Sequence, residues 1–198
     1  MITPKEQPRS KKIFLCIIAL LMLLGGLYAL YTLLSPELSR YVTDPDNNQT
    51  TQLLKNTKQA AHDQPRLYIP KIDVNVPYAA GDESVMEHGA WWRKPENGNP
   101  KDGGNFVLSA HRFLMGFTPD QTMRKSPFYH IDKLAVGDEL VVDYEGSRYT
   151  YMISQVYAVT PNAIEIEDRT SEPRLTLYSC TLGGASDGRE VIIATLKT

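Results

Sequence analysis

One cysteine, one arginine and one histidine in this chain could together carry out acyl transfer through sulfur. Cys180 closes the run RLTLYSC, and Arg189 opens the run REVIIATL. The loop between the two runs, residues 181–188, is rich in glycine and small side chains, which would leave the sulfur uncrowded. In antiparallel strands about 5 Å apart the guanidinium would lie beside the thiol, favour its thiolate form and hold an oxyanion. This pattern predicts a thiol nucleophile with a cationic neighbour.

The run that ends at Cys180 alternates with the period of a β-strand. Leu175 and Leu177 would point into a core, while the opposite face carries Arg174, Thr176, Tyr178 and Cys180. Cys180 would then point away from the core, at a strand end that a substrate can reach. Arg174 is the alternative to Arg189 as the cation of the site.

A histidine within reach of Cys180 would supply the proton for a leaving amine. His111 follows residues 105–110, an expected strand, and would therefore lie at a strand end. The other three histidines lie in segments where a structural or solvated role is more common: His62, His88 and His130. On composition alone, any of the four could partner the cysteine.

Cysteine usage also bears on the role of Cys180. The chain has two cysteines, and Cys16 lies in an apolar N-terminal stretch. If that stretch spans a membrane, the two thiols cannot pair, so the domain is not a disulfide scaffold. A lone exported thiol is either a small buried hydrophobe or a group kept free for chemistry. The glycines and the arginine near Cys180 favour chemistry.

Three separated motifs resemble the sortase family of bacterial membrane-anchored cysteine transpeptidases. TLYSC at 176–180, followed by Arg189, is similar to the TLxTC strand end and catalytic arginine of that family. FVLSAHR at 106–112 matches the strand that ends in the family's catalytic histidine, here His111. The resemblance covers about residues 66–198. Ser179 stands where the family usually has threonine. This difference keeps the hydroxyl and removes a methyl group.

The resemblance implies a function as well as a fold. His111, Cys180 and Arg189 would be catalytic, and Thr176 and Ser179 would bind substrate. The enzyme would cleave an LPxTG-like sorting signal, form a thioester on Cys180 and pass the protein to an amine on a peptidoglycan precursor or a pilin. The alternatives are a plain cysteine peptidase and a membrane-tethered β-barrel that binds a peptide without catalysis.

No cofactor is expected to be required. No cluster of histidine, cysteine or acidic residues has the spacing of metal ligands. Some sortases bind calcium through acidic loops, and Glu165, Glu167 and Asp168 could contribute to such a site, although a solvated acidic face is more common. After residue 34 the chain carries 17 basic against 22 acidic residues, a net charge of −5, which argues against nucleic-acid binding.

The N-terminal part predicts a membrane anchor. Residues 1–12 form a basic head, and residues 13–34 contain no charged side chain and are long enough to span a bilayer. Basic residues before the span place the N-terminus in the cytoplasm and the catalytic domain outside the bacterial cell membrane. Residues 35–65 are expected to be a stalk, and residues 66–198 the catalytic domain. Asp44-Pro45 in the stalk lacks the aromatic residue of a sortase lid, which favours wall anchoring over pilus assembly.

The elements expected around the site are mainly strands. Glu139–Tyr144 and Ser147–Val159 would form a hairpin that turns at Glu145-Gly146, with Tyr149, Tyr151, Ile153, Tyr157 and Val159 on one face. Residues 84–92 are expected to form a short helix that includes both tryptophans, and residues 113–127 a long loop. Strands with short turns predict a nearly closed β-barrel. The resemblance implies a closed, sortase-like barrel of eight strands with short helices, preceded by one transmembrane helix.

Overall fold

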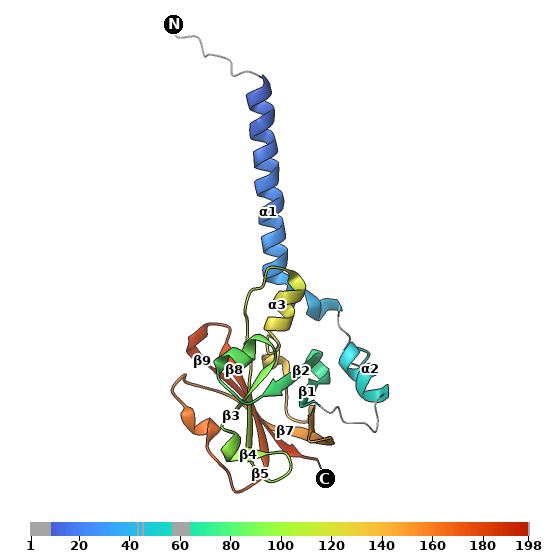
Figure 1. Cartoon of the computed structure of the whole chain (residues 1–198), viewed down its shortest axis with the longest axis vertical. Helices are drawn as coiled ribbons and strands as arrows, with labels where there is room; N and C mark the ends of the chain where they lie inside the picture. The colour runs from blue at the N-terminus through green and yellow to red at the C-terminus, as the bar shows by residue number, and fades with distance from the viewer. Residues whose placement is uncertain (1–8, 43, 45, 57–63, 198) are drawn as a thin grey trace.

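The computed structural model describes residues 9–42, 44, 46–56 and 64–197. A long helix, α1 (Arg9–Val42), projects from a domain built mainly of strands (Figure 1). Its span Ser10–Ser39 is the part of the described chain that is long and apolar enough to cross a membrane. The helix runs through Pro36 to Val42, so it continues past residue 34 into the segment expected to be a stalk.

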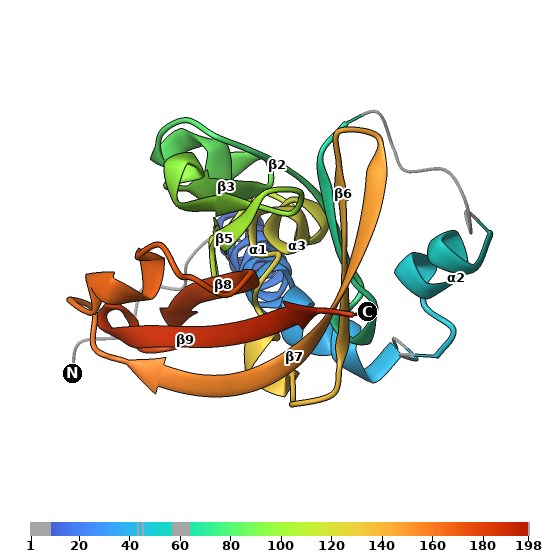
Figure 2. The same cartoon turned by 90° about the horizontal axis from the view of Figure 1, so that it is seen from below.

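Eight strands close into a barrel. The strands of the sheet are β1 (Arg66–Ile69), β2 (Val74–Ala79), β3 (Ala90–Arg93), β4 (Gly98–Asn99), β5 (Gly103–Ser109), β6 (Glu139–Tyr144), β7 (Ser147–Val159), β8 (Arg174–Thr181) and β9 (Gly184–Leu196). The sheet order is β3-β2-β1-β6-β7-β9-β8-β5-β4, and a further pairing of β3 with β5 closes the ring. Seen from below, β7 and β9 lie side by side as long curved ribbons (Figure 2). The predicted fold class is confirmed, with the two-residue β4 as an addition outside the ring.

The barrel interior is filled by alternate residues of its strands. Leu175 and Leu177 of β8 are fully buried in it, as the period of two predicts. Trp92 from β3 packs edge to face on Phe106 and on Tyr78, with ring centroids 5.4 and 6.3 Å apart. A smaller apolar cluster covers the outside of β8 and β9, formed by Ile166, Val191 and Ile193 with Tyr157, Val159, Ala163 and Tyr178 packed against it.

The β6–β7 hairpin has the predicted bounds. Glu145 and Gly146 both have positive φ, 47° and 72°, as a tight hairpin turn requires. The single face predicted for β7 is wrong, because the register with β9 shifts between Ile153 and Gln155. This bulge leaves Tyr151 and Ile153 in the barrel and turns Tyr157 to the outer cluster.

The short helices differ in part from the prediction. They are α2 (Gln49–Asn56), α3 (Pro119–Lys125) and the 3₁₀ turns η1 (Pro70–Ile72), η2 (Glu83–Glu87), η3 (Pro95–Asn97), η4 (Ile131–Lys133) and η5 (Ile164–Glu167). The expected helix over 84–92 is wrong after Glu87, since both tryptophans lie in β3, paired with β2 and β5. The expected loop 113–127 contains α3, which Thr118 caps by accepting a hydrogen bond from the backbone N–H of Gln121.

Candidate active site

The register of the β8–β9 pair places Cys180 opposite Arg189. The two residues are Cα partners, immediately before the irregular step that leads into the connecting turn. Cys180 is a free thiol of intermediate exposure, and Arg189 is likewise half-buried. The local alternation and the glycine-rich loop were therefore enough to predict this pairing.

His111 lies at the same end of the barrel. Strands β5 and β8 are parallel, and Ser109 is paired with Tyr178. His111 and Cys180, each two residues further along, therefore lie at the same level of the barrel. A hydrogen bond of 2.8 Å from the hydroxyl of Ser179 to the carbonyl oxygen of Ala110 joins the two strands just before these residues. Three neighbouring strands thus bring an imidazole, a thiol and a guanidinium to one barrel end.

The guanidinium of Arg189 is held by its own loop. Its Nη1 donates to the carbonyl oxygens of Ala185 and Gly188, at 2.8 and 3.0 Å. Since the guanidinium carries five N–H donors, bonds through one nitrogen leave donors free to reach a substrate oxygen. The rival cation, Arg174, lies at the opposite end of β8 and donates to the side-chain oxygen of Asn105 at 3.2 Å.

Thr176 and Ser179 do not fit the predicted role in substrate binding. Both are fully buried, and both hydroxyls are used inside the protein. The hydroxyl of Thr176 donates to the side-chain oxygen of Asn105 at 2.6 Å, and that of Ser179 to the carbonyl of Ala110. Each hydroxyl is thus used by a residue of β5 or of its end, Asn105 or Ala110, and the local pattern of β8 does not reveal these distant partners.

Glu87 is a neighbour of His111 that the sequence did not indicate. Its Oε1 lies 3.9 Å from Nε2 of His111, and its Oε2 forms an ion pair of 2.7 Å with Nζ of Lys125 in α3. The hydrogen bond from Lys125 lowers the pKa of Glu87, so this carboxylate stays charged beside the imidazole. Local patterns could not reveal this role of Glu87, because its contacts join segments far apart in the chain.

A second unpredicted feature is the buried cation of Arg112, directly after His111. Its Nη2 forms an ion pair of 2.7 Å with Asp132, while its Nε and Nη1 have no hydrogen-bond partner in the described part of the chain. The hydrogen bond with Lys133 and the charge of Arg112 outweigh the effect of burial and leave the pKa of Asp132 below its usual value. Arg112 thereby ties the strand end at His111 to η4.

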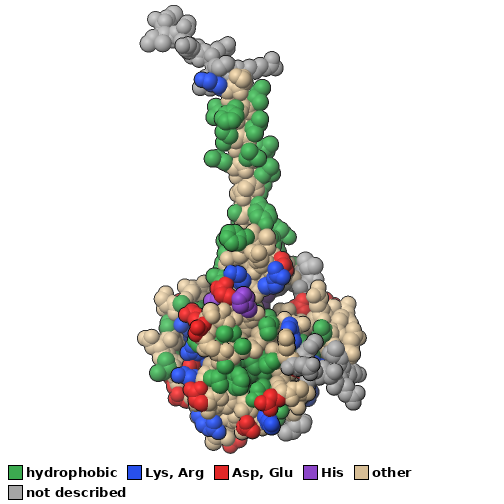
Figure 3. Space-filling view, in the orientation of Figure 1, with side chains coloured by type: hydrophobic (Ala, Val, Ile, Leu, Met, Phe, Trp, Pro, Cys, Tyr) green, Lys and Arg blue, Asp and Glu red, His purple; other side chains and the backbone are tan. Residues whose placement is uncertain are grey.

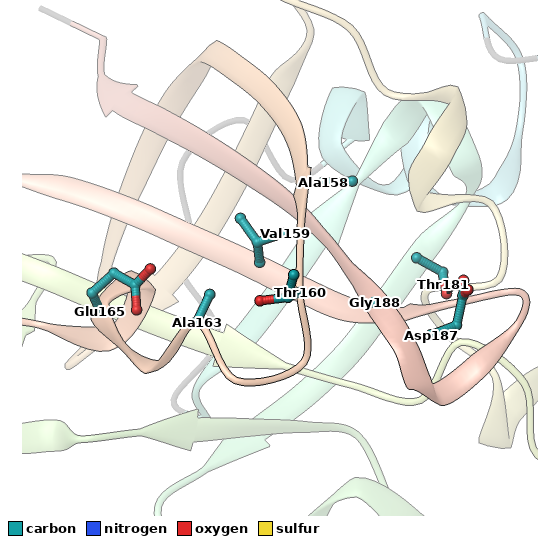
Figure 4. Close-up of a pocket in the computed structure, with 8 residues that line it drawn as sticks. All are labelled: Ala158, Val159, Thr160, Ala163, Glu165, Thr181, Asp187 and Gly188. Atoms are coloured by element: carbon teal, nitrogen blue, oxygen red, sulfur yellow. Dashed lines mark hydrogen bonds between the residues drawn. The ribbon is translucent and has the colours of Figure 1, made fainter.

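An open cavity of about 580 Å³ borders the ends of β8 and β9, where Cys180 and Arg189 lie. It lies between the β7–β8 connection and the β8–β9 loop (Figure 4). Its lining combines small apolar and hydroxyl side chains with two carboxylates: Ala158, Val159, Thr160, Ala163, Glu165, Thr181, Asp187 and Gly188. Cys180 and Arg189 are not among the lining residues, but their chain neighbours Thr181 and Gly188 are, so the cavity lies at the strand ends that carry the two candidate catalytic groups.

The β7–β8 connection that walls this cavity is fixed by buried polar contacts. Asn105 donates from its side-chain nitrogen to the carbonyls of Ile166 and Asp168, at 2.9 and 2.8 Å. Glu167 accepts hydrogen bonds from Arg93 at 2.7 Å and from the hydroxyl of Tyr178 at 2.5 Å. The cavity wall is therefore anchored to β3, β5 and β8.

The suggested calcium ligands are only partly available. Glu167 is already neutralised by Arg93, whereas Glu165 and Asp168 are exposed. Within the ranges that the structure describes, no group of three or more histidine, cysteine or acidic side chains is placed to hold a metal ion. Of the other histidines, Nε2 of His130 lies 2.8 Å from the carbonyl oxygen of Pro36, and His62 is outside the described residues.

Comparison with known proteins identifies relatives of the whole domain. The sortase domain model matches residues 67–197. Sortase A of Streptococcus agalactiae serotype III (strain NEM316) is 28% identical over 153 residues, which are 75% of this chain and 60% of that protein. Sortase SrtE1 of Streptomyces coelicolor (strain ATCC BAA-471 / A3(2) / M145) is 30% identical over 142 residues, 64% of this chain and 38% of that protein.

A solved structure shows the same fold. The Clostridium perfringens sortase D5 transpeptidase superposes with a TM-score of 0.57 at 22% identity, over 77% of this chain and 91% of that one. The chain spans 60% and 38% of the length of the two curated relatives, less than two thirds of each, while it covers most of this solved domain. With a family model that covers most of its length and a barrel of the same fold, the chain belongs to the sortase family.

Proposed function

We propose that this protein is a membrane-anchored cysteine transpeptidase that joins a sorting-signal protein to an amine. The observation that carries the proposal is the convergence of Cys180, Arg189 and His111 on one barrel end. The first two are paired across β8 and β9, and the third ends the strand on the other side of β8. Membership of the sortase family supports the same reaction class.

In the proposed first step, the thiolate of Cys180 attacks the carbonyl carbon of the scissile peptide bond. The carbonyl oxygen becomes an oxyanion, and Arg189 stabilises its charge. His111, as the imidazolium, gives its proton to the departing amine, so that the C–N bond breaks and a thioester remains on Cys180. In the second step an acceptor amine attacks the thioester, His111 takes the amine proton, and the thiolate leaves.

The cavity at the ends of β8 and β9 is the proposed place for the sorting signal. Its small apolar residues, Ala158, Val159 and Ala163, fit an aliphatic side chain of an LPxTG-like peptide. The acceptor would be an amine of a peptidoglycan precursor or a pilin lysine. The reaction is proposed to need no metal or other cofactor.

The anchor supports a place for the reaction at the outer face of a bacterial membrane. The described chain has one helix apolar enough to span a bilayer. The basic residues before it, Arg9, Lys11 and Lys12, favour a cytoplasmic N-terminus. The barrel would then work outside the cell, where both proposed substrates are found.

Mass spectrometry of the full chain in detergent, incubated with an LPxTG-type peptide and oligoglycine, tests this function. We expect an acyl adduct on the peptide that contains Cys180, cleavage after the threonine of the signal, and a product joined to the glycine amine. Cys180→Ala and His111→Ala should give no product. Hydrolysis alone in the presence of the amine would indicate a peptidase, and peptide binding unaffected by Cys180→Ala without any cleavage would indicate a binding module.

A further inference from the structure

Beyond the proposed reaction, the segment that follows His111 forms an apolar surface beside the anchor helix. Residues 113–118 connect the barrel end to α3, and three of their large side chains are exposed. Phe117 is 90% exposed and Met115 48%, and Phe113 and, on α3, Met123 are also exposed. Three exposed large apolar side chains on this segment, with a fourth on α3, form a patch that a soluble surface would not usually present.

This segment touches α1 within the apolar stretch of the helix. The hydroxyl of Tyr28 donates to the carbonyl oxygen of Phe117 at 3.2 Å. The hydroxyl of Ser35 donates to the carbonyl oxygen of Pro119 at 3.3 Å. Thr32, between them on the helix, is 0% exposed. Figure 1 shows α3 lying against the lower end of α1, so the covered face of the helix is the one toward this segment.

The length of the helix fixes the depth of these contacts. Residues 13–34 carry no charge and span about 33 Å at ~1.5 Å per residue, against a hydrocarbon core of ~30 Å. Counted from Lys12, the far boundary of the core lies near residue 33, about 7 Å beyond Tyr28. Moving the helix outward, away from the cytoplasm, until Tyr28 left the core would draw Lys11 and Lys12 into hydrocarbon, which is costly. Helix tilt places Tyr28 deeper still.

The backbone of the segment is suited to a site with little water. The N–H groups of Leu114, Gly116 and Phe117 donate to the side chains of Ser126, Thr122 and Gln121, at 2.9, 3.0 and 3.0 Å. The carbonyl of Phe117 is satisfied by Tyr28. Irregular backbone is tolerated near lipid only where its polar groups find partners within the protein.

We infer that residues 113–118 insert their apolar side chains into the outer leaflet of the bilayer beside α1, so that the barrel is docked on the membrane and not merely tethered to it. The partner of this surface is the lipid itself, which the continuity with the apolar helix selects over a protein. Charged and histidine side chains gather where α1 meets the domain, directly below its apolar shaft, as expected at the level of the headgroups (Figure 3). The docked end is the barrel end that carries His111 and Cys180.

Tryptophan quenching by brominated phospholipids tests this inference in the full chain, reconstituted in liposomes. Phe117→Trp and Met115→Trp report on the segment, and Leu23→Trp reports on the middle of α1. Ile164→Trp is the matched control. Ile164 is 78% exposed, and it lies on η5, on the side of the domain away from α1 (Figure 1). The emission of the unmodified chain, from Trp91 and Trp92, is subtracted.

We expect lipids brominated near the headgroup end of the acyl chain to quench residues 117 and 115, and lipids brominated near the chain end to quench residue 23. Neither lipid should quench residue 164. Quenching at 23 together with no more quenching at 117 and 115 than at 164 would overturn the docking and leave the anchor intact. The inference rests on the proposed anchor, so lack of quenching at 23 would overturn both. The readout needs no catalysis, so it is independent of the proposed reaction.

Discussion

The hydroxyl of Ser179 donates a hydrogen bond of 2.8 Å to the carbonyl oxygen of Ala110, one residue before Cys180 and one before His111. Both partners are buried. This bond therefore continues the β5–β8 pairing beyond Ser109 and Tyr178, up to the residues before the imidazole and the thiol. The hydroxyl, which serine and threonine share, is the part of the side chain that makes this contact.

Replacing Ser179 by alanine should disturb catalysis through this contact. The mutation leaves a buried carbonyl without a donor, which costs about 1–3 kcal/mol. We expect a lower free energy of unfolding in urea and a lower kcat, because His111 is no longer held level with Cys180. Ser179→Thr keeps the hydroxyl and should retain most of the activity.

Ser147→Ala is a suitable control, because Ser147 is exposed at the start of β7. It should change the free energy of unfolding by no more than about 0.5 kcal/mol. Equal activity of the Ser179→Ala and Ser147→Ala variants would show that the bond does not position the site.

Arg189→Lys tests whether Arg189 of β9, and not Arg174 of β8, is the cation of the site. Lysine keeps the positive charge and loses the planar fork that binds the loop carbonyls and, in the proposed reaction, the oxyanion. We expect a loss of kcat of at least about tenfold, with little change in thermal stability, since the side chain is half-buried at a strand end. Single-turnover formation of the acyl adduct measures the step directly.

Arg174→Lys is the matched comparison. Arg174 lies at the far end of β8, bonded to Asn105. Its replacement should leave the acylation rate nearly unchanged. The reverse result, with acylation lost in Arg174→Lys and kept in Arg189→Lys, would reassign the cation of the site.

Glu167 should make the stability of the domain depend on pH in the acid range. Burial alone would raise the pKa of Glu167, but hydrogen bonds from Arg93 and Tyr178 outweigh it and leave the pKa below its ordinary value. The folded protein therefore binds this proton less readily than the unfolded chain does. The stabilisation is fully present above about pH 4.5, and it is lost as the pH falls through the lower pKa of the folded state.

Glu167→Gln should thus lower the melting temperature at about pH 7 and flatten its fall between about pH 5 and about pH 3. Thermal denaturation followed by circular dichroism measures both. Glu165→Gln, an exposed neighbour on the same 3₁₀ turn, should follow the parent curve. A Glu167→Gln curve parallel to the parent curve throughout the acid range would contradict the assignment.

Local sequence signals predicted the parts of the fold that local contacts determine. The β6–β7 hairpin follows from alternation on both sides of Glu145-Gly146, and the pairing of Cys180 with Arg189 follows from a similar pattern. The bulge near Ser154 has no such signal, since a shift of register changes no residue type. Trp91 and Trp92 lie in a strand because β2 and β5 pair with them, which overrides the local preference of residues 84–92.

The same distinction applies to the candidate site. The motif residues could be found because each ends a strand of clear pattern. Glu87 could not, because its contact with His111 depends on how η2 packs against β5 and on Lys125 from α3. The burial of Thr176 was also hidden from the sequence, since it depends on the distant neighbour Asn105.

Asn105 should be the residue on which the β7–β8 connection most depends. It is fully buried, donates to two carbonyls of the connection and accepts from Thr176. Asn105→Ala removes a partner from both carbonyls, from Thr176 and from Arg174, which should lower the free energy of unfolding by about 3 kcal/mol or more. Asn105→Asp keeps the acceptor for Thr176 and removes both donors to the carbonyls, so it isolates the effect on the connection.

Hydrogen exchange followed by mass spectrometry locates this effect. In Asn105→Asp we expect faster exchange over residues 160–173 than in the parent, and a higher KM for the sorting peptide, because these residues wall the cavity at the ends of β8 and β9. Asn162→Ala, in the same connection and exposed, should change neither. Unchanged exchange over 160–173 in a folded Asn105→Asp variant would mean that Glu167 and its partners hold the connection without Asn105.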